Sequence, residues 1–121
     1  MPIPITNQSA RSGGDTERLA CSYLQAGGLH LLERNYRCRR GGIDLVMREG
    51  DTLVFVEVRF RASSRFGTPA ETVNIHKQRR LTAAAARYLR HHPTKPACRF
   101  NVIVVSGNHH VDWIRNAFNV Q

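Results

Sequence analysis

The chain has 121 residues, of which 18 are Lys or Arg and 9 are Asp or Glu, so its formal net charge is +9. This length allows one domain with a substantial core and excludes two domains of ordinary size. Such an excess of positive charge predicts a polyanionic partner, for which nucleic acid is the usual candidate and an anionic membrane surface the rival. No stretch is apolar enough to span a bilayer, and the N-terminus lacks a signal-peptide pattern, so we expect no membrane partner.

The cysteines indicate the redox compartment. Cys21, Cys38 and Cys98 lie far apart in the chain, and none is part of a Cys-x-x-Cys pair. An odd number of isolated cysteines predicts reduced thiols rather than disulfides or a zinc site. We therefore expect a cytoplasmic protein.

The first predicted element is a helix that follows an irregular N-terminal segment. Residues 1–12 mix Pro, Asn, Gln and Ser without periodicity and predict a flexible arm, which leaves 13–121 as the folded domain. A helix is expected over 15–26 and ends at the glycine pair Gly27 and Gly28.

Glu17 breaks the pattern of this helix. At about 100° per residue, its side chain projects between those of Cys21 and Leu24, inside the apolar arc. A first-turn Glu is favoured by the helix dipole and can complete a capping interaction. The alternative is an acid that points toward the sheet, and the sequence leaves both explanations open.

Three strands are predicted next. Residues 29–32 indicate a short strand, which leads into a basic segment over 34–40. Strands over 42–47 and 52–60 follow, and the Gly50-Asp51 pair between them is typical of a hairpin turn.

Each strand of this hairpin carries one carboxylate among apolar residues. Glu57 shares a strand face with Leu53 and Phe55, and counting back from the turn places Asp44 directly opposite Glu57. Directly opposed side chains have Cβ atoms about 5 Å apart, so the two acids repel each other unless a cation lies between them. We therefore expect a site for Mg²⁺ or Mn²⁺, since Mg²⁺ favours a couple of carboxylates plus waters. The alternative is a pair of edge-strand charges that prevent aggregation.

A loop over 62–69 and a second helix over 70–91, ended by Pro93, come next. Extending the apolar stripe of this helix backward places Lys77 on the side that faces the sheet, with Gln78 beside it. Lys77 is either a cation close to the predicted acids or a side chain whose stem covers apolar surface while its charge stays in water.

Many arginines surround these elements. They predict contacts with phosphate groups that do not read base sequence, and the alternative is a solvated surface. The expected nucleic-acid-binding residues are Arg37, Arg39, Arg40, Arg61, Arg65, Arg79 and Arg80.

The chain ends with a buried strand over 98–106, a short strand over 111–114 and a last turn over 115–118. The resulting order is α-β-β-β-α-β-β. It predicts an α/β domain with a central, mixed five-stranded sheet flanked by helices.

The acids and the neighbouring polar residues form a coherent set for phosphodiester hydrolysis. One or two Mg²⁺ ions on this set would polarise a phosphodiester and lower the pKa of an attacking water. The expected catalytic residues are Glu17, Asp44, Glu57, Arg59, Lys77 and Gln78, and the expected metal ligands are Asp44, Glu57, the backbone carbonyl of Val58, and Glu17.

The pattern of Asp44 followed by Glu57-Val58-Arg59 resembles the PD-(D/E)XK signature of nucleases with the restriction-endonuclease-like fold. Several further motifs resemble the YraN-like uncharacterised family (UPF0102-type proteins), which is similar to archaeal Holliday-junction resolvases. The motifs lie in the family's order between about Gly14 and Phe118, and they are Asn35-Tyr36-Arg37-Cys38-Arg39, Gly42-Ile43-Asp44-Leu45, Val54-Phe55-Val56-Glu57-Val58-Arg59, Lys77-Gln78 and Arg99-Phe100.

This resemblance implies a nuclease-like fold, binding of nucleic acid, with branched or structured DNA as the expected form, and a homodimer. By motif position it also assigns roles to six residues. Glu17 matches the first-helix acid, Asp44 and Glu57 match the metal ligands, Arg59 matches the signature lysine, and Lys77 and Gln78 match the motif at the start of the second helix.

The chain departs from the family pattern at three positions. Gly42 stands where the family usually has Glu, Arg59 replaces the signature lysine, and Asn101 stands where Asp often occurs. Arginine keeps the positive charge but stays protonated, so it cannot accept a proton from water. The first two departures weaken the expectation of catalysis while metal and phosphate binding remain expected. Lys77 is a candidate replacement for the lost lysine.

Three functional interpretations follow. The leading one is a nucleic-acid-binding protein with a nuclease-like fold and Mg²⁺-dependent, structure-selective endonuclease activity. The second is a DNA- or RNA-binding accessory module without effective catalysis. The third is a basic interaction protein without a metal site, whose acids pair with its arginines.

Overall fold

A computed structural model describes residues 13–61, 73–92, 96–107 and 110–118. Its elements follow the predicted order α-β-β-β-α-β-β. The arm expected over 1–12 and the loop expected over 62–69 lie outside the described residues. The elements are α1 (Gly13–Ala26), β1 (His30–Cys38), β2 (Gly41–Glu49), β3 (Thr52–Arg61), α2 (Ile75–Arg90), β4 (Cys98–Ser106) and β5 (Val111–Phe118).

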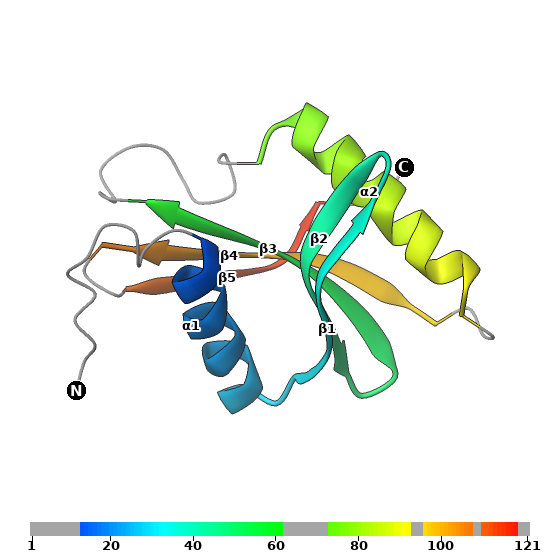
Figure 1. The fold of residues 1–121 in the computed structure, drawn as a ribbon. Coiled ribbons are helices and arrows are strands. Elements are labelled where there is room, and N and C mark those ends of the chain that lie inside the picture. Colours follow the sequence, from blue (N-terminus) through cyan, green and yellow to red (C-terminus); the bar gives the residue numbers. More distant parts are fainter. Residues whose placement is uncertain (1–12, 62–72, 93–95, 108–109, 119–121) are drawn as a thin grey trace.

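The strands form one mixed sheet in the order β1-β2-β3-β4-β5. β3 and β4 are parallel, and the other neighbouring strands are antiparallel. Parallel neighbours need a crossover connection, and α2 lies within the one that joins β3 to β4. α1 and α2 pack on opposite faces of the sheet (Figure 1), which confirms the predicted α/β class.

Each helix buries its own set of sheet residues. Leu53 and Phe55 of β3 pack in the core layer of α2, whereas Val54 and Val56 pack in the layer of α1. This division follows from the alternation of side chains along a strand. Because a buried Val, Leu or Phe contributes about 1.5–3 kcal/mol, β3 is held firmly between the two layers.

The β2–β3 hairpin has the predicted register. Glu49 pairs with Thr52 around a turn in which Gly50 has φ +60°, a value that glycine tolerates best. The ladder continues to the pair of Leu45 with Val56 and ends there. Asp44 and Glu57 therefore occupy the next opposed positions, where the two strands begin to separate.

β1 is longer than the sequence analysis predicted. The strand expected over 29–32 is present, but its expected end is wrong, because β1 continues through most of the basic segment to Cys38. β1 is an edge strand with mostly exposed side chains, so it lacks an apolar alternation. Its backbone pairing with β2, for example of Tyr36 with Ile43, holds the strand instead.

The turn expected over 115–118 is also wrong, since β5 extends to Phe118. Phe118 stacks on Phe100 of β4 with 4.8 Å between ring centroids. Asn116 has φ +52°, and its backbone N–H donates a 2.9 Å hydrogen bond to the side chain of Asn101. A left-handed Asn is common in turns. This one instead marks an irregular point within a strand.

α2 begins at Ile75 rather than at residue 70. Asn74 is its N-cap, and the side-chain oxygen of Asn74 accepts a 3.0 Å hydrogen bond from the backbone N–H of Lys77. The predicted apolar stripe is confirmed, because Leu81, Ala84 and Ala85 are buried against the sheet.

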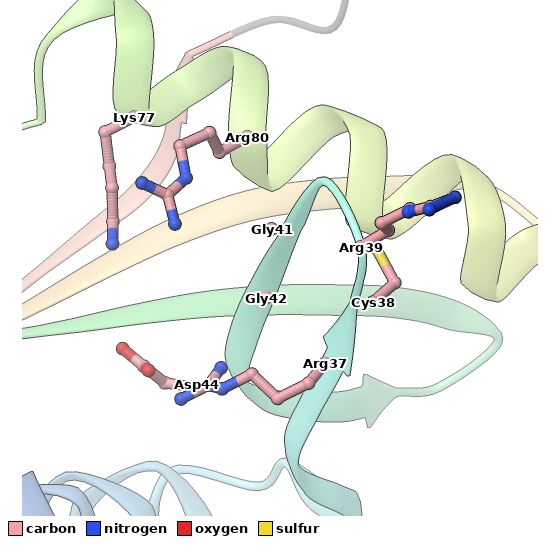
Figure 2. A pocket seen from close by; sticks show the side chains of 8 residues that line it. All are labelled: Arg37, Cys38, Arg39, Gly41, Gly42, Asp44, Lys77 and Arg80. Atoms are coloured by element: carbon pink, nitrogen blue, oxygen red, sulfur yellow. The ribbon is translucent and has the colours of Figure 1, made fainter.

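The start of α2 lies very close to the start of β2 (Figure 2). A Cβ atom added to Gly41 would lie 2.5 Å from the backbone oxygen of Arg80, which is closer than such atoms approach. Glycine at position 41 therefore lets this helix pack against the β1–β2 end of the sheet. Neither described helix is long and apolar enough to cross a membrane.

Candidate active site

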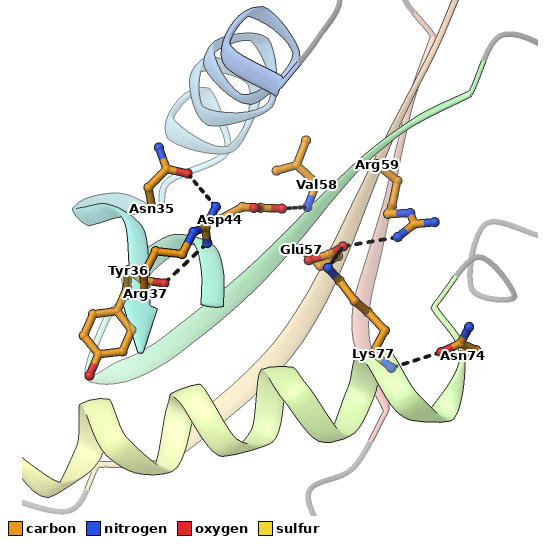
Figure 3. Close-up of polar contacts among 9 residues, drawn as sticks. All are labelled: Asn35, Tyr36, Arg37, Asp44, Glu57, Val58, Arg59, Asn74 and Lys77. Atoms are coloured by element: carbon orange, nitrogen blue, oxygen red, sulfur yellow. Dashed lines mark hydrogen bonds and ion pairs between the residues drawn. The ribbon is translucent and has the colours of Figure 1, made fainter. Parts of the chain in front are cut away.

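The site begins where β2 and β3 separate. A carboxylate oxygen of Asp44 accepts a 2.8 Å hydrogen bond from the backbone N–H of Val58 (Figure 3). Asp44 thus provides Val58 with the acceptor that a continued ladder would have supplied. In an extended strand the N–H and C=O of one residue point to the same side. The carbonyl of Val58 therefore also faces β2 and Asp44.

Glu57 is a buried acid in this structure, with 4% of its surface exposed. Its Oε2 atom lies 3.4 Å from Nζ of Lys77 and 3.4 Å from Nη1 of Arg59. Both distances are long for charge-assisted hydrogen bonds, which are about 2.7–2.9 Å. Lys77 and Arg59 therefore compensate the charge of Glu57 only in part.

Electrostatic effects on Glu57 agree with this geometry. Burial raises the pKa of Glu57, and the nearby carboxylate of Asp44 raises it further. The positive charges of Lys77 and Arg59 oppose these effects, yet the net shift of the pKa is upward. Glu57 is thus a carboxylate that a further cation would stabilise.

Glu17 faces the same region from α1. Burial raises the pKa of Glu17, and so does the negative charge of Asp44, whereas Arg37 and Asn35 lower it. Because these groups belong to β1 and β2, Glu17 is directed toward the sheet rather than held in a cap. Asp44 acts electrostatically on both Glu17 and Glu57, which brings the predicted acids of α1, β2 and β3 into one neighbourhood.

The polar residues of α2 divide into two kinds. Lys77 reaches Glu57 from the first turn of the helix, which favours the first of the two explanations that the sequence left open. The side-chain nitrogen of Gln78 instead donates a 3.0 Å hydrogen bond to the backbone carbonyl of Val73. Gln78 therefore secures the start of α2.

Several predicted arginines surround a cleft of about 200 Å³ next to Asp44 (Figure 2). Arg37, Arg39 and Arg80 line it, together with Lys77. Arg40 and Arg79, each next to a cleft residue in the sequence, are exposed. Arg61 is half-buried at the end of β3, and Arg65 lies outside the described residues.

The residues available for a metal ion form a small set of oxygen donors. Across the described ranges, no group of three His, Cys, Asp or Glu side chains is arranged to hold an ion. Asp44, Glu57 and the Val58 carbonyl nevertheless make a set that suits Mg²⁺, which binds one or two carboxylates and keeps several waters. The incompletely compensated charge of Glu57 gives an electrostatic reason for a cation there.

Two residues that support the site were missed by the sequence analysis. Asn35 has φ +51° on β1, and its side chain helps to lower the pKa of Glu17. Asn74 caps α2 and fixes the turn that carries Lys77. An Asn three residues before Lys77 is a recognisable capping signal. No comparable signal in the sequence marks Asn35, which lies on an edge strand.

Comparison with known proteins identifies the family. A model of the uncharacterised protein family UPF0102 matches residues 16–105, a range that contains Glu17, Asp44, Glu57 and Lys77. The chain belongs to the UPF0102 family. This result confirms the resemblance to the YraN-like family drawn from the sequence motifs.

Relatives of similar length come from several bacteria. A UPF0102 protein of Nitrosomonas europaea is 49% identical over 115 residues, which cover 93% of this chain and 98% of the relative. UPF0102 proteins of Chromohalobacter salexigens and Ralstonia nicotianae are each 50% identical, with 93% and 99% of this chain covered and 94% and 95% of the relatives. These family names state no activity.

Proposed function

We propose that this UPF0102 protein binds nucleic acid and hydrolyses phosphodiester bonds in branched or structured DNA with the aid of Mg²⁺ or Mn²⁺. One observation carries the proposal. Asp44 and Glu57 lie close together on neighbouring strands, with Lys77 at 3.4 Å from Glu57, beside a cleft whose charged lining consists of four cations and Asp44. A buried acid with a raised pKa, as Glu57 is, next to such a cleft is a frequent mark of catalytic sites.

The proposed hydrolysis needs both a bound metal ion and side chains of the protein. Asp44, Glu57 and the Val58 carbonyl would hold the ion, and a bound Mg²⁺ supplies polarisation of the phosphodiester and a more acidic water. The ammonium group of Lys77 stabilises negative charge that develops on the phosphoryl oxygens. Arg59 stays protonated, so its contribution is charge alone.

The resemblance to PD-(D/E)XK nucleases supports the same assignment. In this chain the Asp and the Glu-x-Arg of that signature belong to the two strands of one hairpin, β2 and β3. We therefore extend the proposal to a restriction-endonuclease-like fold with a resolvase-like preference for branched DNA. A cytoplasmic location, suggested by free thiols at all three cysteines, and a homodimer complete it.

A second candidate function is nucleic-acid binding without turnover. It is favoured by Arg59, which takes the place of the signature lysine, and by Gly42, which lacks the family's carboxylate. In addition, both Arg59 and Lys77 already pair with Glu57. A module of this kind would keep the basic surface and lose catalysis.

A cleavage assay separates the candidates. The purified protein is incubated with branched, flapped and single-stranded DNA and with Mg²⁺ or Mn²⁺. The first proposal expects cleavage that Asp44→Ala and Glu57→Ala abolish. Glu49→Ala is the matched control, since Glu49 pairs with Arg99 and Arg115 at the hairpin turn.

The other outcomes are equally informative. Binding in EDTA without cleavage of any substrate supports the accessory module and contradicts the nuclease proposal. Absence of both binding and cleavage contradicts both candidates and leaves a basic interaction protein.

A further inference from the structure

The cleft beside Asp44 has the size and lining of a site for one phosphate group. Its volume of about 200 Å³ is below the roughly 300–1,000 Å³ of pockets that enclose whole small-molecule ligands. β1 and the start of β2 form one wall, and the first turns of α2 form the other. Figure 2 shows Lys77 and Arg80 extending from α2 toward the strands, with Arg37 and Asp44 across the cleft from them.

The charge of this cleft favours an anion. One carboxylate, that of Asp44, lines it together with the cationic side chains of Arg37, Arg39, Lys77 and Arg80. Among the residues that the structure describes, Arg37 and Arg80 have no carboxylate within ion-pair distance. Their guanidinium groups can therefore bind phosphate oxygens, for which the planar guanidinium is well shaped.

Gly42 determines where Arg37 lies. A Cβ atom added at position 42 would stand 2.8 Å from Cδ of Arg37 and still closer to its Nη1 atom. Arg37 pairs with Gly42 across the β1–β2 ladder, so its side chain crosses the space that a side chain at position 42 would fill. The guanidinium is steadied by a 3.3 Å hydrogen bond to Asn35 and a 3.5 Å contact with the Tyr36 carbonyl.

Glycine at position 42 makes this arrangement possible, because the absence of a side chain there leaves room for the Arg37 side chain. A positive charge therefore stands next to Asp44 on this side of the cleft. Such a charge opposes binding of a second cation and favours binding of a phosphate.

We infer that Arg37, placed by Gly42, and Arg80 bind one backbone phosphate of the nucleic acid next to Asp44. The choice of a nucleic-acid phosphate rests on the proposed function, whereas anion binding by the cleft does not. Arg39 points away from the other cations in Figure 2, and we assign it no contact with this phosphate. Binding of the phosphate requires no metal ion.

The test uses inorganic phosphate as the probe and NMR of the backbone amides in metal-free buffer. Saturable shifts are expected at the amides of Gly41 and Gly42. Arg37→Ala weakens phosphate binding about tenfold, the effect of losing one charge-assisted hydrogen bond. Arg48→Ala removes the same charge from the far end of β2, where Arg48 contacts the Gly50 carbonyl, and leaves binding unchanged.

Gly42→Ala is the decisive variant because it keeps every charge. The added methyl group collides with the Arg37 side chain and lies 3.0 Å from the Tyr36 carbonyl oxygen, which needs to shift by only a few tenths of an ångström. We therefore expect the fold to be retained while the guanidinium is displaced. We expect the loss seen for Arg37→Ala, and the double variant should bind no more weakly than either single variant. Thermal unfolding confirms that each variant is folded.

Two results would overturn the inference. One is phosphate binding by Gly42→Ala as tight as that of the unaltered protein. The other is an equal loss for Arg48→Ala, which indicates general attraction by the net charge. Neither result contradicts the nuclease proposal. Absence of cleavage, in turn, does not contradict binding of phosphate by the cleft.

Discussion

Glu57 shows at the level of one residue how a functional group opposes stability. Its carboxylate is buried in a strand that is otherwise apolar, and burial and Asp44 together raise its pKa. A residue selected for stability alone would be uncharged at this position. The cost of ionising Glu57 in the folded state is therefore an argument for a cation-binding role.

The first prediction concerns the pH dependence of stability in Glu57→Gln. Because the folded-state pKa of Glu57 is raised above its ordinary value of 4.5, ionisation of Glu57 destabilises the fold as pH rises through the raised pKa. Glutamine resembles the protonated acid. The variant should therefore have a higher Tm than the unaltered protein at about pH 8 and an equal Tm below about pH 4.

Glu49→Gln provides a control of opposite sign. Arg115 and Arg99 hold the pKa of Glu49 below its ordinary value, so this ion pair stabilises the fold above 4.5 and is lost on acidification. Glu49→Gln should lower Tm near neutral pH and have no effect at low pH. If both variants respond to pH in the same direction, our account of Glu57 is wrong.

The second prediction concerns Lys77. If its ammonium group replaces the lost signature lysine, Lys77→Ala should lower the cleavage rate about 100-fold, as removal of one group that stabilises the transition state does. Lys77→Arg should retain part of the rate because it keeps the charge. DNA affinity, measured in EDTA, should change far less than the rate. An unchanged rate in Lys77→Ala would remove Lys77 from the mechanism.

At the level of elements, the hairpin was predictable and the edges of the sheet were not. Gly50 at the turn and the alternation of buried residues along β3 define the register, and hence the position of Asp44 opposite Glu57. β1 is an edge strand with mostly exposed side chains, so its length left little trace in the side-chain pattern. β5, the other edge strand, is irregular at the left-handed Asn116, which interrupts its pattern before Phe118.

The third prediction tests the packing of α2 on the hairpin. In Gly41→Ala the new methyl group meets the backbone of Arg80, which cannot move without shifting the helix. We expect destabilisation by about 1–3 kcal/mol in urea unfolding, the usual effect of overpacking. Gly14→Ala is the control, since a Cβ atom there meets no atom within 4 Å. Equal stability of the two variants would show that α2 does not depend on this contact.

At the level of the whole molecule, the net charge and the types of residue in the site could be predicted from the sequence, but the cleft could not. The net charge of +9 and the acids of α1, β2 and β3 were visible in the sequence. The cleft arises because α2 approaches the β1–β2 hairpin closely at Gly41, which brings Arg80 near Arg37. Contacts between segments so distant in sequence depend on packing and could not be read from local patterns.

The fourth prediction concerns the salt dependence of binding. Each phosphate neutralised on duplex DNA contributes about −0.9 to the slope of log K against log salt concentration. The cleft contacts two phosphates in our proposals, one bound by Arg37 and Arg80 and one at Lys77, so it gives a slope of about −2, and contacts of the exposed arginines make the slope steeper. Fluorescence anisotropy between about 50 and 200 mM salt measures it. Binding that is indifferent to salt would favour the basic interaction protein.

The most direct test of the central claim is a titration with Mn²⁺ observed by NMR. A paramagnetic ion held by Asp44 and Glu57 should selectively broaden the amide signals around Val58, and Mg²⁺ should reverse the effect by competition. Asp44→Ala and Glu57→Ala should each abolish the broadening, whereas Glu49→Ala should not. Broadening that is confined to exposed acids, or that persists in both site variants, would contradict the claim that these carboxylates form one ion-binding site.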